Sequence, residues 1–407
     1  MKIVANKIFI VSEFVDRTSN STGYYWNKII AGFVNKEIFT KVISTEKSLR
    51  LMDLDGDLIQ LAPIGTKNEY GKDAVLARAF GQLRLSIQFF ITLRKNLKRG
   101  DILFSGTNPA FLLIFIAVLK PALGFKWMLL VHDIFPENLV PAKISKPQAI
   151  SYRVAKLIFD RCYQSADVLI AIGQDMQILL RDKIKRVDGI EYIPNWVDVS
   201  EFSAERISKA IENLPPKDVT DHLITFQFFG NFGRVQGIGF LLSAIERVKS
   251  KRANFLFIGG GSSDPEIDDF ITNHPNIRMV KRPPLPFKQN HEGLFACDIA
   301  IISLAPGMLG LAVPSKAYFS LAANKKILVV GDYGSELQKL VDRHPEIGWF
   351  CRAGDLLSLA NTIDQICLNF ESEKNSYQTD LVKDKFSSEI AINEYLRIFQ
   401  RLIVENS

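Results

Sequence analysis

Short apolar runs recur along the chain, and most are separated by segments in which apolar residues recur at helical spacing. The runs lie at residues 7–11, 40–43, 58–61, 102–104, 128–131, 168–172, 224–229, 255–258, 277–280, 299–302 and 327–330. They alternate little between apolar and polar residues, which is typical of strands buried on both faces of a parallel sheet. Strands that alternate with helices predict an α/β fold with doubly wound parallel sheets.

Two strands of the second half run directly into glycine-rich loops. The strand 224–229 leads into residues 230–237 (GNFGRVQG), and the next strand leads into residues 259–261 (GGG). Both loops fall at the carboxyl edge of one sheet, where helix amino termini present unpaired N–H groups that attract phosphate. Arg234 adds a fixed positive charge. A nucleotide diphosphate is the ligand that such a site fits best.

A later helix start in the same half also suits phosphate. It follows the strand 299–302 and the glycine-rich loop 305–310 (APGMLG). Pro314 fits a first helical turn. Ser315 and Lys316 would offer a hydroxyl, backbone N–H groups and an ammonium to a phosphate.

In the first half, the buried strand 128–131 brings His132 and Asp133 to the carboxyl edge of its sheet, and Glu137 follows in the loop. Side chains at this edge reach a cleft. We expect a functional role for His132 at this edge, with the two acids close by. The alternative is a structural histidine, but the chain has only five histidines and this one ends a central strand. Gly23, after the first strand, allows close backbone approach to a ligand.

The chain predicts two domains of ordinary size. Its 407 residues are 47% hydrophobic and 23% charged, which is typical of a globular protein. No strand is predicted between residues 198 and 224, and this interval contains a proline pair at 215–216. We therefore place the domains at residues 1–200 and 201–386.

The positive charge is uneven. Residues 1–200 hold 27 Lys and Arg against 19 Asp and Glu, and the rest holds 23 against 25. No nucleic-acid motif accompanies this excess, so it favours an anionic membrane surface; the alternative is solubility alone. The segment 82–99 has an apolar face and a basic end, as an interfacial helix would, or as a core-packed helix with its basic end in water. The longest apolar stretch, 110–131, is interrupted by charge and is too short to span a bilayer.

Four cysteines occur singly, which favours a reducing compartment and argues against disulfides and structural zinc. The first 14 residues have no cleavage-site pattern, so they predict a strand and not a signal peptide. Residues 53–57 (DLDGD) could hold a divalent ion, but they lack the spacing of a calcium loop. We favour a solvated turn there.

These motifs resemble those of the family 4 glycosyltransferases of the GT-B fold. The loop 230–237, the glycines 259–261 and the segment 313–316 (VPSK) resemble the family's donor domain. Residues 132–137 (HDIFPE) and 193–198 (IPNWVD) resemble its amino-terminal domain, in the branch that builds bacterial surface polysaccharides. The resemblance runs from Gly23 to Asp355.

The resemblance implies two Rossmann-like domains that face a cleft, with a last helix, about 387–404, that crosses back to the first domain. It implies a nucleotide-sugar donor, UDP favoured over GDP, transfer with retention, and no metal or other cofactor. The acceptor is expected to be lipid-linked or a saccharide, and the protein to be cytoplasmic and peripherally bound to the membrane. Nucleic acid is not an expected partner.

The resemblance also assigns roles to single residues. Arg234 matches the arginine that neutralises the donor diphosphate, and His132 matches the histidine beside the transferred sugar. The expected catalytic residues are His132, Asp133, Glu137 and Arg234. We expect His132 to position the sugar or the acceptor hydroxyl and Asp133 or Glu137 to orient it. The expected donor-binding residues are Gly23, Gly233, Gln236, Gly259, Gly260, Gly261, Pro314, Ser315, Lys316 and Phe319.

The sequence departs from the family at three positions. Gln236 stands where many members have a lysine, and Leu311 and Phe319 stand where many have a pair of glutamates. The missing glutamates keep a binding protein without turnover as an alternative, and a sugar-nucleotide epimerase is a second alternative because it shares the two-domain fold. A nicotinamide-dependent oxidoreductase is disfavoured, because the first strand is not followed by GxGxxG and an acid about twenty residues on.

Overall fold

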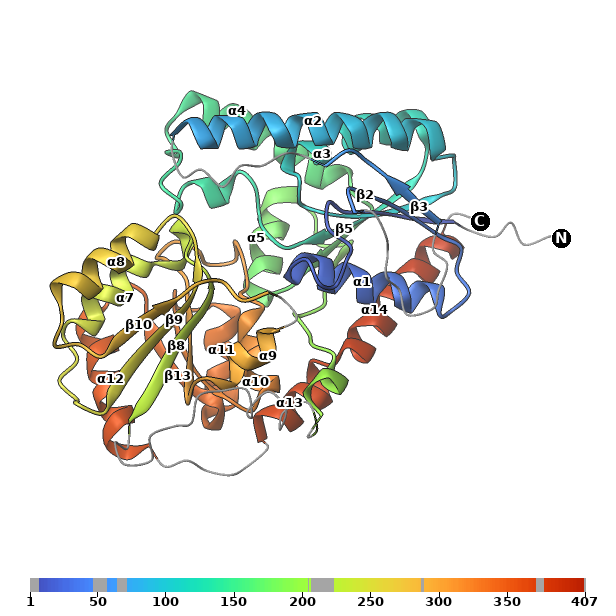
Figure 1. Cartoon of the computed structure of the whole chain (residues 1–407). Coiled ribbons are helices and arrows are strands. Elements are labelled where there is room, and N and C mark those ends of the chain that lie inside the picture. The colour runs from blue at the N-terminus through green and yellow to red at the C-terminus, as the bar shows by residue number, and fades with distance from the viewer. Residues whose placement is uncertain are drawn as a thin grey trace.

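Two parallel β-sheets, each covered by helices, make up the protein (Figure 1). The computed structural model describes residues 7–46, 57–63, 72–203, 205, 223–286, 289–370 and 377–405. The predicted α/β architecture of two Rossmann-like units is confirmed. Residues 53–56 of the acidic motif and the proline pair 215–216 lie outside the described residues.

The first sheet has the strand order β3-β2-β1-β4-β5-β6-β7, and all its pairs are parallel. Its strands are β1 (Ile8–Val11), β2 (Thr40–Ser44), β3 (Asp57–Gln60), β4 (Ile102–Gly106), β5 (Lys126–Val131), β6 (Val168–Ala171) and β7 (Ile190–Tyr192). The central strands β1 and β4 are buried at every residue, because helices cover both faces. The order reverses between β1 and β4, which is where such sheets bind ligands.

The second sheet has the order β10-β9-β8-β11-β12-β13 and is also parallel. Its strands are β8 (Ile224–Asn231), β9 (Ala253–Gly260), β10 (Met279–Arg282), β11 (Ile299–Ser303), β12 (Lys326–Gly331) and β13 (Gly348–Arg352). Strand β10 starts two residues later than its apolar run predicts, because it pairs in register with Phe255–Ile258 of β9. The order reverses between β8 and β11.

The helices that follow the first-sheet strands are α1 (Ser21–Val34), α2 (Lys72–Asn96), α3 (Ala110–Leu123), α4 (Ile150–Ser165) and α5 (Gln174–Ile184). Helix α1 begins where Asn20 accepts the backbone N–H of Gly23 at 2.9 Å. Helix α3 ends at Gly124, whose positive φ of 68° suits glycine. Figure 1 shows α2, α3 and α4 along the upper side of this sheet.

The second-sheet helices are α7 (Ile238–Ile245), α8 (Asp264–Asn273), α9 (Asn290–Phe295), α10 (Lys316–Ala322), α11 (Glu336–Arg343), α12 (Leu356–Asn369) and α13 (Tyr377–Lys385). The last helix, α14 (Ser388–Val404), packs on α1 of the first sheet. The rings of Phe33 and Phe399 meet edge to face with centroids 5.4 Å apart. None of the helices in the described ranges has an apolar stretch long enough to cross a bilayer.

Helix α2 contains the predicted segment 82–99 up to Asn96. Its inner side chains Leu85, Phe89 and Leu93 are fully buried, as a core-packed helix requires. Its outer side chains Ile87 and Ile91 are exposed. The buried face fits the core-packed alternative, and membrane binding by this helix stays a prediction.

Candidate active site

Two adjoining cavities lie where the carboxyl ends of the two sheets face each other. The larger, of about 520 Å³, is here called the glycine cavity. Its lining residues are Ser19, Asn20, Ser21, Phe229, Gly230, Asn231, Gln236, Gly259, Gly260, Pro284, Leu285, Leu294, Pro314, Ser315, Lys316 and Phe319. Most come from β8, β9, the start of α10 and the start of α1, so segments of both sheet domains contribute.

The glycine cavity depends on residues without side chains. Gly259 has a φ of 152°, and a Cβ built there would lie 1.8 Å from the carbonyl oxygen of Gly230. Gly230 itself has a φ of 127°. A side chain at Gly259 would force the ends of β8 and β9 apart, whereas Gly230 is required by its positive φ alone. Gly260 lines the same wall.

Lys316, the first residue of α10, is the charged group of this cavity. Its Nζ lies 3.5 Å from the centroid of the Phe228 ring. No Asp or Glu occurs among the described residues that line the cavity. Burial lowers the pKa of Lys316 to about 7. An ammonium that is buried without a carboxylate gains most from an anionic ligand.

The smaller cavity, of about 300 Å³, is here called the histidine cavity. Its lining residues are Ser12, Ser21, Thr22, Tyr25, Trp26, Gly106, Asn108, His132, Asp133, Ile172, Asn195, Val235, Gln236, Leu304, Ala312, Val313, Pro314 and Ser315. Four residues line both cavities: Ser21, Gln236, Pro314 and Ser315. A ligand could therefore extend from Lys316 in one cavity to His132 in the other.

Burial shifts both titratable groups at the end of β5 toward their neutral forms. It lowers the pKa of His132 to about 4 and raises the pKa of Asp133 to about 6. His132 is therefore neutral at physiological pH and can both donate and accept a hydrogen bond. Asp133 is the acid among the described residues that line the two cavities.

The two sheets are tied together beside this histidine. Asp133 forms an antiparallel bridge with Ala312, and Ile134 donates its N–H to the carbonyl of Leu311 at 3.1 Å. Asn195 donates its Nδ2 to the carbonyl of Val313 at 3.0 Å. These contacts hold the segment before Pro314 and Lys316 against the first sheet.

The structure does not bring Arg234 to either cavity. The residue begins the short 3-10 turn η3 (Arg234–Gln236), its side chain is exposed, and it is not a lining residue. Gln236, two residues on, lines both cavities and has a buried Oε1 without a hydrogen-bond partner among the described residues. The sequence thus located the turn, but the residues of this turn that line the cavities are Val235 and Gln236.

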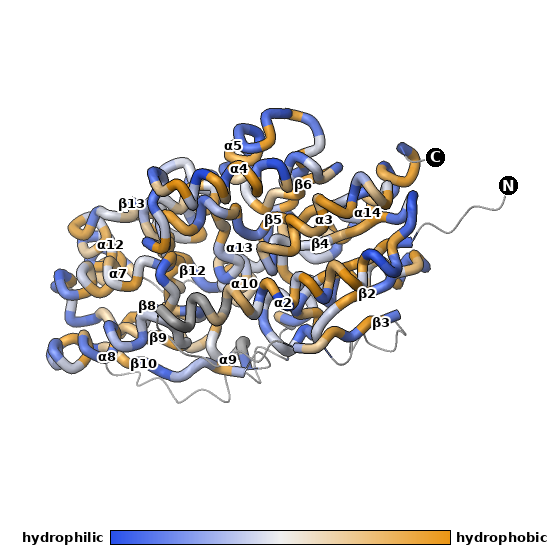
Figure 2. Tube along the Cα trace, turned by 90° about the horizontal axis from the view of Figure 1, so that it is seen from above, coloured by the Kyte–Doolittle hydropathy of each residue, from blue (hydrophilic) through white to orange (hydrophobic). Residues whose placement is uncertain are grey.

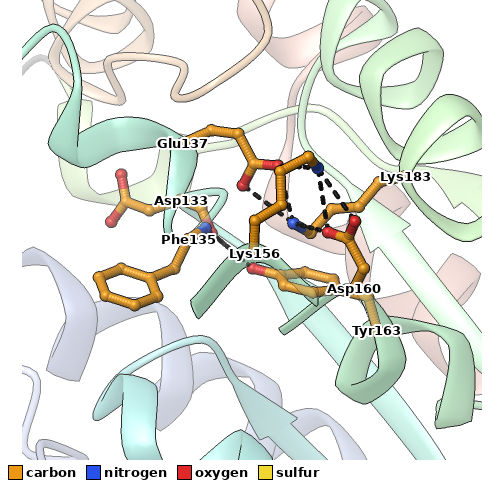
Figure 3. Close-up of polar contacts among 7 residues, drawn as sticks. All are labelled: Asp133, Phe135, Glu137, Lys156, Asp160, Tyr163 and Lys183. Atoms are coloured by element: carbon orange, nitrogen blue, oxygen red, sulfur yellow. Dashed lines mark hydrogen bonds and ion pairs between the residues drawn. The ribbon is translucent and has the colours of Figure 1, made fainter. Parts of the chain in front are cut away.

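Glu137 also lies away from both cavities. Its carboxylate pairs with Lys156 at 2.7 Å and with Lys183 at 2.9 Å, and Asp160 completes the cluster (Figure 3). The Lys183 side chain is 2% exposed, so this carboxylate neutralises a buried ammonium. Figure 3 shows Asp133 pointing away from the cluster. The expectation that Glu137 orients a hydroxyl is not supported, because its carboxylate is held in a structural ion-pair cluster.

Three expected glycines have packing roles in this structure. A Cβ on Gly23 would lie 2.3 Å from the carbonyl oxygen of Asp16, and one on Gly261 would lie 2.5 Å from that of Phe232. A Cβ on Gly233 would lie 2.7 Å from Oε1 of Gln236. None of the three lines a cavity. They let neighbouring segments approach closely and so shape the site indirectly.

Phe319 lines the glycine cavity as part of an aromatic group. Its ring centroid lies 5.3 Å from that of Tyr24 and 6.3 Å from that of Tyr25. The sequence analysis did not select Ser19, Asn20 and Ser21 at the start of α1, which line this cavity too. The signal for them was the polar loop after the first strand, which ends in a helix-capping asparagine.

Two facing Rossmann-like units with a shared cleft define a GT-B glycosyltransferase fold. The chain is 38% identical over 410 residues to the probable glycosyltransferase WbjE of Pseudomonas aeruginosa, covering 98% of this chain and 99% of that protein. The family model of Glycosyltransferase Family 4 matches residues 60–201. The chain belongs to the family 4 glycosyltransferases.

Two further similarities are more distant. WcaI of Escherichia coli K12, named for a role in colanic acid biosynthesis, is 22% identical over 189 residues, 45% of each chain. The structure of HepE from Anabaena in complex with UDP and glucose superposes with a TM-score of 0.67 at 14% identity, covering 97% of this chain and 100% of that one. At this identity the match concerns the fold alone.

Proposed function

We propose that this glycosyltransferase moves a sugar from a nucleotide diphosphate sugar, UDP preferred over GDP, to a lipid-linked saccharide in surface polysaccharide synthesis. The observation that carries the proposal is the position of Lys316 in a cavity whose described lining residues include no acid and which shares lining residues with the cavity of His132. The solved relatives with UDP and the name of WcaI support the nucleotide and the pathway class.

The glycine cavity would hold the diphosphate. Backbone groups of the glycine wall, the hydroxyl of Ser315 and the ammonium of Lys316 face one space. Charge grows on the diphosphate as the bond from the sugar C1 to the phosphate oxygen breaks, and fixed positive groups stabilise it without reorganising. Arg234, on the turn that carries Gln236, would add its charge from the rim.

The histidine cavity would hold the sugar and the acceptor hydroxyl. Neutral His132 would position a hydroxyl, and Asp133 would orient that hydroxyl or the imidazole. The acceptor oxygen forms the new bond to C1, the diphosphate leaves with the electron pair, and the acceptor proton passes to the leaving oxygen. This same-face route gives retention, as the family resemblance implies, and it needs no metal or other cofactor.

The uneven positive charge of the chain supports a lipid-linked acceptor and a location at a membrane. The excess of cations in residues 1–200 suits an anionic membrane. We propose that the protein acts at the inner face of the cytoplasmic membrane as a peripheral protein.

A nucleotide-sugar panel tests the function. Thermal unfolding is measured with UDP- and GDP-sugars, because a ligand that binds only the folded state raises its stability. The best donor is then incubated with and without membrane lipid extract, and the anomeric configuration of the product is read by NMR. We expect a UDP-sugar to stabilise and to be consumed only with acceptor. Donor isomerised without acceptor would indicate an epimerase, and binding without turnover a non-catalytic protein.

A further inference from the structure

Helix α4 exposes a row of apolar side chains to solvent, whereas a helix at a protein surface usually turns such a row toward the core. Ile150, Val154, Leu157 and Ile158 are 79%, 52%, 55% and 40% exposed. They follow one another at helical spacing, so they form one outward row. An exposed row of this kind marks an interaction surface.

The ion pairs of α4 face the opposite way. Lys156 and Asp160 pair with Glu137 and with Lys183 of α5, on the side of the helix that meets the rest of the domain (Figure 3). The helix also packs Phe159 and Tyr163 inward. It is therefore held firmly in place, and its outer row is not the result of a loose helix.

Helix α2 continues the same surface. Its exposed apolar residues Phe80, Ile87 and Ile91 are 71%, 42% and 45% exposed and also follow helical spacing. Helix α3 packs between α2 and α4 and exposes Val118. Figures 1 and 2 show the three helices side by side on the upper side of the molecule. We call the exposed residues of α2, α3 and α4 the α2/α4 face.

Cations surround this apolar surface. They are Arg84, Arg94 and Lys95 on α2, Arg153 and Arg161 on α4, and Lys143 and Lys146 in the loop before α4. Their side chains have no ion pair or hydrogen bond to a described residue, and all are exposed. The α2 residues whose side chains the structure describes, 77 and 79–96, include no Asp or Glu, and the one acid of α4, Asp160, is already paired.

The face adjoins the candidate active site. Strand β5 ends at His132, and the chain then runs through η1 (Glu137–Leu139) to the loop that carries Lys143 and Ile144. Ile144 is 48% exposed. Pro141 of this loop lies close to Gly307 of the second sheet, since a Cβ built on that glycine would be 3.8 Å from the Pro141 Cβ. The loop that carries Lys143 and Ile144 therefore connects the α2/α4 face to the strand that ends at His132.

We infer that the α2/α4 face docks on an anionic phospholipid bilayer. Apolar side chains would enter the interface while Lys and Arg contact the headgroups. A second copy of this chain fits less well, because two such faces would oppose unpaired cations. The inference rests on the proposed lipid-linked acceptor and names the surface that would present it.

Vesicle binding tests the inference. The full chain is pelleted with vesicles of phosphatidylglycerol and phosphatidylcholine, and with vesicles of phosphatidylcholine alone, at low and high salt. We expect binding to the anionic vesicles that weakens with salt. Val154→Asp with Leu157→Asp should weaken it at least ten-fold, and Arg153→Ser with Arg161→Ser by about five-fold for each cation removed.

The matched control lies on α12 of the second sheet. Leu357 and Leu368 are 65% and 72% exposed, so Leu357→Asp with Leu368→Asp makes the same chemical change elsewhere. The inference is overturned if the parent does not pellet at low salt or if the control variant loses binding equally. It is also overturned if light scattering shows a dimer that the α4 variant dissociates.

The same variants separate this inference from the proposed function. UDP-glucose binding should be unchanged in the α4 variant, since the substituted residues lie outside both cavities. A parent protein that binds the nucleotide sugar but does not bind vesicles would overturn the docking face alone. Vesicle binding without nucleotide-sugar binding in the parent would contradict the proposed function instead.

Discussion

The ammonium of Lys316 lies over the ring of Phe228, 3.5 Å from its centroid, at the wall of a cavity that no described acid lines. A cation gains from the face of an aromatic ring but less than from a carboxylate. Burial lowers the pKa of Lys316 to about 7. The residue is therefore prepared to take up a proton when an anion enters.

This relationship predicts that nucleotide-sugar affinity depends on pH. A bound diphosphate favours the charged amine, so the pKa of Lys316 rises on binding and a proton is taken up. Affinity is then greatest below pH 7 and weakens by about ten-fold from pH 7 to pH 8.5. Isothermal calorimetry with UDP-glucose at several pH values measures this dependence, because the diphosphate of UDP-glucose keeps its charge in this pH range.

Lys316→Met serves as the comparison in that titration. We expect weak binding that is independent of pH. The folded-state pKa of Lys316 is below its ordinary value, so the charged amine destabilises the fold at neutral pH, and this cost shrinks as pH rises from about 7 and is gone above 10.5. The variant should therefore be more stable by roughly 1–3 kcal/mol at pH 7. Equal affinity in both proteins would exclude Lys316 from the site.

Arg234→Ala should separate activity from stability. The side chain is exposed and makes no described contact, so the free energy of unfolding should change by less than about 0.5 kcal/mol. We expect kcat/KM to fall by about 100-fold, as when a group that stabilises a developing anion is removed. Arg247→Ala, which changes another exposed arginine of the second sheet, is the control. Activity within a few-fold of the parent would show that Arg234 does not reach the diphosphate.

His132 and Asp133 predict a particular pH profile. Since burial raises the pKa of Asp133 to about 6, the carboxylate form is lost as pH falls through 6, and kcat/KM should fall with it. Asp133→Asn should abolish this limb. His132, with a pKa of about 4, stays neutral throughout. His132→Ala should lower kcat by about 100-fold. If kcat/KM of Asp133→Asn still fell as pH drops through 6, a group other than Asp133 would be responsible for the acidic limb.

Glu137→Gln tests the structural role of that carboxylate. The change leaves Lys183, 2% exposed, with Asp160 as its remaining partner in the cluster. The free energy of unfolding should fall by about 3 kcal/mol, as measured by urea denaturation. At a temperature where the variant is folded, kcat should stay near the parent value. A large loss of kcat in folded protein would return Glu137 to the active site.

The sequence predicted the fold well because the signals are local. Strands buried on both faces read as continuous apolar runs, and β8 and β9 end in glycines that their close approach requires, as at Gly259. Lys316 was found for the same reason, since Pro314 and Ser315 mark the start of its helix. Helix ends and strand ends are set by neighbouring residues, and their chemistry can be read from the chain.

What the sequence could not predict depends on distant partners. Glu137 was assigned to the site because it follows His132, but its direction is set by Lys183, 46 residues away. Gly23 was assigned to a ligand, although its nearest contact is the carbonyl of Asp16. The sequence yields no prediction of the exposed row of α4, because the exposure of Leu157 and Ile158 depends on which distant segments pack against the helix.

A structure of the protein with UDP-glucose is the most direct test of the central claim. The account predicts that the diphosphate lies in the glycine cavity, within hydrogen-bonding distance of Lys316 Nζ and the backbone around Gly230 and Gly260, with the glucose directed toward His132. A nucleotide bound outside this cavity, or a diphosphate that does not contact Lys316, would contradict it.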